Sequence, residues 1–335
     1  MKNGIAICGN IFIDHVKTVD TFPEEGMLAN LLAQDHCVGG CVSNTVINLS
    51  KLETKAPLYA VGCVGKDSDG DYLMDTLRQH EINTDYVSVK EGGVTGFTDA
   101  VVSLKRHTRT FFTMQGVNAA FGPSDIPVNS MNVKIAHLGY ALLLDAMDRK
   151  DPEYGTVMAR VLCELQSRGI KTSIDVVSES GERFQKVVIP SLKYCSYLIV
   201  NEIEAGMVAG IPARDPDGTL REEAIPAICQ KLFSFGVGEC VVTHCPEAGY
   251  YMDREGNFYA QKSLSLPKGF IVSSVGAGDA FCAGALYGLY HELSPREILK
   301  IGNGAAAASL SGDNSINGLT GLEQVDRLNQ QYGQE

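Results

Sequence analysis

Short apolar runs alternate with longer amphipathic segments along most of the chain. The apolar runs predict buried strands at residues 4–9, 57–62, 133–138, 170–175, 196–200 and 238–243. The intervening segments, whose apolar residues recur at helical spacing, predict helices at residues 41–52, 69–81, 152–168, 221–235, 276–290 and 295–310. Strands that alternate with helices predict a three-layer α/β/α sandwich around a mostly parallel central sheet.

Two segments depart from this alternation and predict a small β-rich lid. Residues 96–104 and 109–114 are β-prone runs, and the polar residues between them favour a hairpin turn. We expect these strands to join a segment near the N-terminus, so that the lid is formed by about 12–38 and 94–116. Because no low-complexity linker divides the chain, we expect a single domain, 1–335, with the lid inserted in it.

Composition narrows the classes of partner. A formal net charge of −12 argues against nucleic acid, because a nucleic-acid-binding surface needs clustered Lys and Arg. No apolar run approaches the roughly 20 residues of a membrane span, so we expect no membrane association. The ten cysteines are scattered, which indicates free thiols in a reducing compartment. With no signal peptide visible after Met1, the cytoplasm is the expected location.

The segment with the clearest chemistry is 270–284, FIVSSVGAGDAFCAG. A β-rich run, 271–275, leads into glycines at the start of a helix, where backbone N–H groups and the helix dipole favour an anion. Such a turn can stabilise a phosphoryl group during its transfer. Asp279 follows the last glycine and could accept the proton of an attacking hydroxyl. The alternative is that Asp279 only caps the helix.

The segment VGAGDAFCAG resembles the C-terminal signature of the ribokinase-like (PfkB) carbohydrate kinases. Further segments resemble other motifs of this family in the same order along nearly the whole chain, namely Gly39-Gly40 with Asn44, Val61 to Gly70, Asn201 to Glu204, and Thr243 to Gly249. Asp14 matches the early substrate-binding Asp of the family. The resemblance implies an ATP-dependent kinase that phosphorylates a hydroxyl of a small sugar.

The resemblance also implies a role for each matching residue. The general base is Asp279, and the anion hole is formed by Gly276, Ala277 and Gly278. ATP and Mg²⁺ are positioned by Asn201 and Glu204, with Glu204 nearest the metal. The nucleotide pocket is lined by Thr243, Gly249 and Asn303. The substrate hydroxyls are bound by Asp14, Gly39, Gly40 and Asn44. We expect Arg109, at the base of the lid, either to reach into the site or to stay solvated.

Some positions depart from the family pattern. Ser273 stands where the signature usually begins with Asp, and 311–318 lacks the usual turn, so activation by a monovalent cation stays open. Cys41 and Phe12 replace residues typical of ribokinases, which weakens the specific prediction of ribose. Two alternatives therefore remain, a nucleoside kinase on the same fold and a non-catalytic ligand-binding homologue. Lids in this family often pair edge to edge, so we expect a homodimer through the lid.

Overall fold

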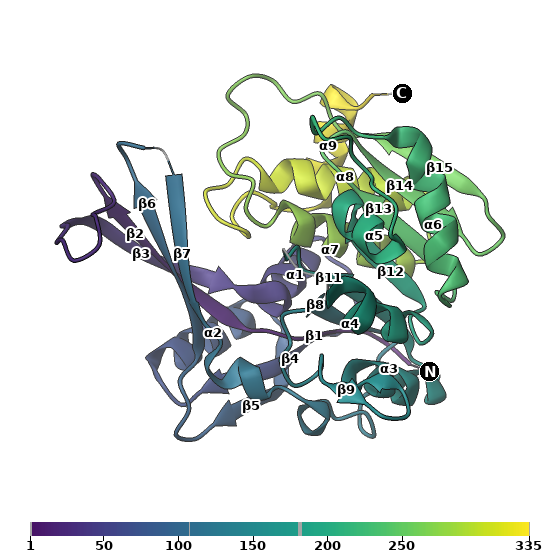
Figure 1. Cartoon of the computed structure of the whole chain (residues 1–335), viewed down its shortest axis with the longest axis horizontal. Coiled ribbons are helices and arrows are strands. Elements are labelled where there is room, and N and C mark those ends of the chain that lie inside the picture. The colour runs from purple at the N-terminus through teal and green to yellow at the C-terminus, as the bar shows by residue number, and fades with distance from the viewer. Residues whose placement is uncertain (1, 107, 180–182, 335) are drawn as a thin grey trace.

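Two β-sheets and the helices that cover the larger one make up the structure, a computed structural model that describes residues 2–334 apart from 107 and 180–182. The larger sheet runs through the middle of the molecule with helices on both faces (Figure 1). The smaller sheet projects from one end, on the left of Figure 1, and its strands come from two separate stretches of the N-terminal third of the chain.

The central sheet has nine strands in the described part of the chain, in the order β15-β14-β13-β12-β11-β8-β1-β4-β5. Pairing is parallel from β5 to β13, and the last two strands are antiparallel. The strands are β1 (Ile5–Cys8), β4 (Leu58–Gly65), β5 (Asn83–Lys90), β8 (Ile135–Ala141), β11 (Lys171–Val176), β12 (Tyr197–Asn201), β13 (Cys240–His244), β14 (Ala248–Asp253) and β15 (Phe258–Lys262).

Each face of this sheet carries its own hydrophobic core. In β1, Ile5 and Ile7 pack into one core while Ala6 and Cys8 pack into the other, because successive side chains point to opposite faces of a strand. One face is covered by α1 (Gly40–Lys51), α2 (Ser68–Gln79), α7 (Ala277–Tyr290), α8 (Pro295–Ser309) and α9 (Leu322–Tyr332). The other face is covered by α3 (Val157–Ser167), α4 (Arg183–Leu192), α5 (Glu202–Ala209) and α6 (Ile225–Ser234). Burial on both faces explains why the parallel strands are uninterrupted apolar runs.

The small sheet consists of β2 (Phe12–Val19), β3 (Leu31–Gly39), β6 (Gly96–Ser103) and β7 (Thr108–Met114), in the order β3-β2-β6-β7. Its two hairpins are antiparallel, and β2 pairs with β6 in parallel, Phe12 opposite Gly96. Short elements complete the chain: a two-stranded ribbon of β9 (Lys150–Asp151) and β10 (Gly155–Thr156), and 3₁₀ turns at Gly116–Ala120, Pro123–Asp125 and Glu222–Ala224.

The three-layer architecture and the additional small sheet predicted from the sequence are confirmed. Helix boundaries differ locally: α3 begins at Val157, after the β9–β10 ribbon, and α6 begins at Ile225, after a 3₁₀ turn. The β-rich run 271–275 was expected to be extended, but it forms no strand. It is bound to the end of α8 instead, where the N–H groups of Val272 and Ser273 donate to the carbonyl of Leu310.

Several elements have no counterpart among those predicted from the sequence. α9 buries only Val325 and Leu328, and α4 contains Pro190. β14 and β15 form the antiparallel end of the sheet; β14 is mostly buried, and every residue of the edge strand β15 is at least partly exposed. None of the helices within the described ranges is both long enough and apolar enough to cross a membrane.

Candidate active site

A cavity of about 270 Å³ opens where the parallel strands of the central sheet end. Its walls come from the carboxyl ends of β8, β11, β12 and β13 and from the first turn of α7. In a parallel sheet all these ends lie along one edge, so the loops that follow them converge on the same space. The lining residues used below are Tyr140, Asp175, Ser178, Asn201, Glu204, His244, Gly276, Gly278 and Asp279.

The first turn of α7 has the geometry of an anion site. Gly276 has φ +80°, and a Cβ at this position would lie 2.4 Å from the Cβ of Ser315, so only glycine fits here. The backbone N–H of Ala277 donates to the carbonyl of Ser274. Within the described residues, the N–H groups of Gly278 and Asp279 have no backbone acceptor, as expected for the first turn of a helix. Because both residues line the cavity, these donors are placed to bind an anion there.

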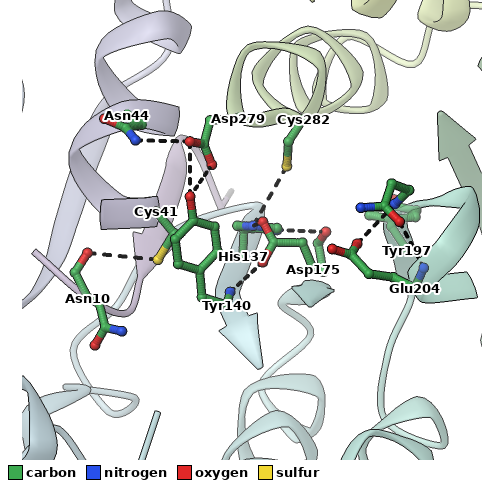
Figure 2. A network of polar contacts seen from close by, with 12 residues as sticks. Asn10, Cys41, Asn44, His137, Tyr140, Asp175, Tyr197, Glu204, Asp279 and Cys282 are labelled. Carbon is green, nitrogen blue, oxygen red and sulfur yellow. Dashed lines mark hydrogen bonds and ion pairs between the residues drawn. The ribbon is translucent and has the colours of Figure 1, made fainter. Parts of the chain in front are cut away.

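Asp279 is buried at the mouth of this helix and is held by neutral donors. The side-chain amide of Asn44 donates to Oδ2 at 2.9 Å, and the hydroxyl of Tyr140 lies 3.0 Å from both carboxylate oxygens (Figure 2). Asn44 is itself fixed, because its Oδ1 accepts a hydrogen bond from the hydroxyl of Ser315 at 2.7 Å. The carboxylate of Asp279 therefore accepts hydrogen bonds from α1 and β8, and it does not serve as a side-chain cap of its own helix.

Burial has the largest effect on the pKa of Asp279. Desolvation is the main cause that raises the pKa of this carboxyl to about 7, and the nearby charge of Asp175 raises it further. The hydrogen bonds from Asn44 and Tyr140 oppose this shift, because they stabilise the ionised form. A carboxyl with a pKa near neutrality is suited to take up a proton during a reaction and release it afterwards.

Asp175, at the end of β11, anchors the centre of the cavity. Its Oδ1 accepts the backbone N–H of Tyr140, and its Oδ2 lies 3.3 Å from Nε2 of His137. His137 is fully buried, with Nδ1 2.9 Å from the hydroxyl of Ser173 and Nε2 3.7 Å from the sulfur of Cys282. Figure 2 shows this group between Asp279 on one side and Glu204 on the other.

Glu204 and Asn201 form a reciprocal cap at the start of α5. The backbone N–H of Glu204 donates to Oδ1 of Asn201 at 2.8 Å, and the backbone N–H of Asn201 donates to Glu204 Oε2 at 3.1 Å. The hydroxyl of Ser178 donates to Glu204 Oε1 at 2.7 Å. Burial raises the pKa of Glu204 to about 7. The cap turns the carboxylate toward the cavity, which Asn201 and Ser178 also line.

The charge of the cavity suits a divalent cation. Three carboxyl groups line it, from Asp175, Glu204 and Asp279, and no Lys or Arg appears among its described lining residues. A phosphate in such a cavity would meet negative charge, unless a cation accompanied it. The oxygen donors of Asn201, Ser178 and Glu204 are of the kind that Mg²⁺ prefers. The residues present therefore fit a magnesium-bound nucleotide.

The residues predicted to bind substrate gather on the other side of Asp279. Asp14, in β2, lies against Gly39, where a Cβ would come within 2.6 Å of Asp14 Oδ2. Gly40 has φ +81° and lies close to the carbonyl of Asn10, so the β3–α1 junction can pass tightly beside β2. Burial raises the pKa of Asp14 to about 6, and the charge of Asp14 contributes to the raised pKa of Asp279. The charge of Asp14 and the amide of Asn44 thus both act on the carboxylate of Asp279.

The residues predicted to line a nucleotide pocket do not line this cavity. The side chain of Thr243 is fully buried, and its hydroxyl has no hydrogen-bond partner among the described residues. A Cβ at Gly249 would lie 2.9 Å from Asn303 Oδ1, and the amide of Asn303 donates to the carbonyl of Gln261 in β15 at 2.9 Å. Gly249 and Asn303 thus join β14 and β15 to α8.

The position of Arg109 is also corrected. Arg109 pairs with Val102, next to the turn that connects β6 and β7, so it lies at the far end of the hairpin and not at the base of the lid. Its side chain lies outside the described part of the structure.

Three residues of the cavity were not predicted as site residues: no motif contains Tyr140 or Asp175, and His244 lies within the Thr243 to Gly249 motif without being singled out. His244 follows Thr243, packs on Phe281 with ring centroids 4.5 Å apart, and lines the cavity; burial lowers its pKa to about 4. Tyr140 and Asp175 were missed too. Their only signal is that a polar residue at the carboxyl end of a buried parallel strand has a high chance of facing a site.

The sequence of this chain is similar to those of known carbohydrate kinases. Residues 2–320 match the sequence profile described as pfkB family carbohydrate kinase. The ribokinase of Haemophilus influenzae is 23% identical over 317 residues, which cover 93% of each chain. The 5-dehydro-2-deoxygluconokinase of Geobacillus kaustophilus is 22% identical over 312 residues, covering 88% of this chain and 85% of its own.

The fold is shared with solved structures as well. The Arabidopsis thaliana ribokinase complexed with ribose and ATP superposes with a TM-score of 0.79 at 20% identity, covering 98% of this chain and 99% of its own. The match of the profile spans the N-terminal motif at Gly39, the cap at Asn201 and the helix start at Asp279. The chain is therefore a member of the pfkB family of carbohydrate kinases.

Proposed function

We propose that this protein transfers the γ-phosphoryl group of ATP to a hydroxyl of a small sugar or sugar-like molecule, with Asp279 as general base. The observation that carries this proposal is the position of the Asp279 carboxylate. It lies beside unpaired N–H groups of a glycine-opened helix, between a group of polyol-binding residues and a carboxylate-rich wall suited to Mg²⁺. Membership of a family of ATP-dependent carbohydrate kinases supports the same reaction.

In the proposed reaction, a substrate hydroxyl donates its hydrogen bond to Asp279 while its oxygen faces the γ-phosphorus. As the new P–O bond forms, the proton passes to the carboxylate, and the bond from the γ-phosphorus to ADP breaks. The N–H groups at Gly278 and Asp279, and Gly276 through its turn, would stabilise the equatorial oxygens of the phosphoryl group. Mg²⁺ held near Asn201 and Glu204 would neutralise negative charge on the nucleotide.

The substrate would lie on the side of Asp14, Gly39, Gly40 and Asn44. A sugar hydroxyl both donates and accepts, so a carboxylate and backbone groups at a tight junction can bind neighbouring hydroxyls. A nucleoside remains the alternative acceptor, because a solved nucleoside kinase of Burkholderia thailandensis, in complex with inosine, has the same fold. Thr243, Gly249 and Asn303 would support the strands that border the nucleotide pocket. Substrate binding by Arg109 also stays a proposal.

The small sheet is proposed to act as a lid and as a dimer interface. Phe111 and Phe112 are neighbours in β7 and therefore point to opposite faces, yet they are 58% and 54% exposed. Leu31 and Leu32 on β3 are also more than half exposed. Both faces thus carry apolar area that one chain leaves uncovered, which favours a second copy as its cover. We place this enzyme in the cytoplasm, where ATP and reduced thiols coexist.

The reaction can be tested by ADP release with a panel of pentoses, hexoses, sugar acids and nucleosides. For the acceptor that is turned over fastest, we expect Asp279→Asn to lower kcat by about 10²–10⁴-fold while ATP binding persists, because the general base is lost. Asp71→Asn, an exposed substitution on α2, is the control and should leave turnover unchanged. Turnover close to wild type in Asp279→Asn would contradict the assignment, and no stimulation by any acceptor would favour a binding protein.

The pH dependence follows from the raised pKa of Asp279, about 7. A base must be ionised to accept a proton, so kcat/KM should rise with pH and level off above this pKa. One unit below it, roughly a tenth of the plateau should remain. A rate that stays constant from pH 5.5 to 8 would show that another group, or none, accepts the proton.

Replacing Glu204 by Gln keeps its shape but removes its charge. We expect the Mg²⁺ concentration for half-maximal rate to rise about 10-fold or more, in line with loss of a group that orients the metal, while the KM for the sugar changes little. Glu202→Gln is a matched control on the same helix, since the Glu202 carboxylate pairs with Arg214 at 2.7 Å and faces away from the cavity. An equal effect of both substitutions would point to general damage to α5.

Light scattering should find the protein at twice the mass of one chain. Phe112→Asp should shift this mass toward a single chain, because it places a charge in the proposed interface. Val89→Asp, at a similarly exposed apolar position on β5, should not. A wild-type mass of one chain at high protein concentration would refute the dimer.

A further inference from the structure

Tyr140 has an unusual backbone conformation for its residue type. It lies at the end of β8 with φ +60°, in the left-handed region, which is uncommon for a bulky residue with a Cβ. Its N–H donates to Oδ1 of Asp175, which holds the strained turn in place. The preceding Gly139 lies so close to Cys41 that a Cβ there would come within 2.8 Å of the Cys41 Cβ. Strained residues of this kind gather at functional sites, where surrounding contacts compensate their cost.

The strained turn directs the phenol toward Asp279. In Figure 2 the ring of Tyr140 stands between Cys41 and Asp175, with its hydroxyl directed at the carboxylate. That hydroxyl lies 3.0 Å from both carboxylate oxygens. Burial is the main cause that raises the pKa of Tyr140 well above its ordinary value, so the phenol keeps its proton and always acts as the donor.

The hydrogen bonds from Asn44 and Tyr140 leave room for a third donor to the Asp279 carboxylate. Each carboxylate oxygen can accept two hydrogen bonds, and the amide of Asn44 occupies one position on Oδ2. Tyr140 bridges the two oxygens and therefore fixes the plane of the group. These contacts restrain rotation of the carboxylate, which lines the cavity and keeps acceptor positions for an incoming hydroxyl.

We propose that Tyr140 is a positioning residue of the phosphoryl-transfer site, whose hydroxyl fixes the orientation of the Asp279 carboxylate and keeps it ionised for receiving the proton of the acceptor. The inference rests on the proposed function. It goes further by assigning a role to a residue that no motif of the chain marks.

The electrostatics around Asp279 explain why a neutral donor matters here. The groups that face it from neighbouring elements either carry negative charge or are neutral: Asp175 from β11, Asp14 from β2, the thiols of Cys41 in α1 and Cys282 in α7, and His244 from β13. His137, also in β8, is in contact with Asp175. No Lys or Arg occurs among the described lining residues. The hydrogen bonds of Tyr140 and Asn44 are therefore the interactions that favour the ionised carboxylate.

The experiment compares the wild-type enzyme with Tyr140→Phe, which keeps the ring and removes the hydroxyl. Two quantities are measured: kcat/KM as a function of pH, and the pKa of Asp279 itself, from the ¹³C resonance of labelled aspartate assigned by its absence in Asp279→Asn. Tyr197→Phe is the matched control, because Tyr197 is buried in β12 outside the cavity lining. Melting temperatures verify that each variant is folded.

We expect the Asp279 resonance and the acid limb of kcat/KM in Tyr140→Phe to move upward by about one pH unit, the effect of losing one hydrogen bond to a charged group. At pH 7 the ionised fraction of Asp279 should fall from about one half to about one eleventh, so the rate should fall roughly 5-fold. It should recover at pH 9, with the KM for ATP unchanged. Tyr197→Phe should show neither shift. Unchanged titration in Tyr140→Phe, even with a lower rate, would overturn the inference and leave Tyr140 a packing residue.

The resonance also separates this inference from the proposed function. If no acceptor is phosphorylated by the wild-type protein, the kinase proposal fails, but the titration of Asp279 still tests the role of Tyr140. If Tyr140→Phe does not fold, uniform incorporation of 3-fluorotyrosine provides a second measurement in the wild-type sequence. Its more acidic phenol is a stronger donor, so the Asp279 resonance should titrate at lower pH, and an unchanged titration would contradict the inference.

Discussion

The buried carboxylate of Asp279 is the constraint on which the rest of the site depends, because hydrogen bonds stabilise it and no Lys or Arg occurs among the described residues that line its cavity. Burying an ionised group is costly unless its lone pairs are satisfied. Here Asn44 from α1, Tyr140 from β8 and the glycine-opened start of α7 provide that satisfaction together. Burial outweighs the hydrogen bonds and raises the pKa of Asp279 to about 7, and the bonds from Asn44 and Tyr140 keep that pKa from rising further.

The central sheet makes this convergence possible. Parallel pairing aligns the carboxyl ends of β8, β11, β12 and β13 along one edge, so residues far apart in sequence share one cavity. The helices α1 and α7 pack on the same face of this sheet, and the side chains of Asn44 and Asp279 meet near their N-terminal ends. Two regions then flank Asp279, the proposed base. Asp14 and Gly40 lie toward the small sheet, and Glu204 lies toward α5. This separation suits a reaction that brings two different substrates to one proton acceptor.

Much of the fold and part of the site could be predicted from the sequence, because they depend on interactions between residues that are neighbours along the chain. The uninterrupted apolar strands, the glycines before Asp279, and the Asn201–Glu204 cap each have a local physical cause. Where local rules were weak, prediction failed. Run 271–275 has the composition of a strand, but no neighbouring strand accepts it and the end of α8 binds it instead. Thr243 and Asn303 do not line the cavity, and their assignment to the nucleotide pocket stays a proposal.

The sequence by itself determined the alternation of strands and helices, the flexible turn before α7 and the identity of the carboxylate at its mouth, because all three are set by neighbours along the chain. Tertiary structure alone decided that Tyr140, Asp175 and His244 face the same cavity, and that the described residues lining it include carboxylates but no Lys or Arg. Those facts depend on strand order and on side-chain direction at strand ends, where one residue of shift moves a side chain from the cavity to the core.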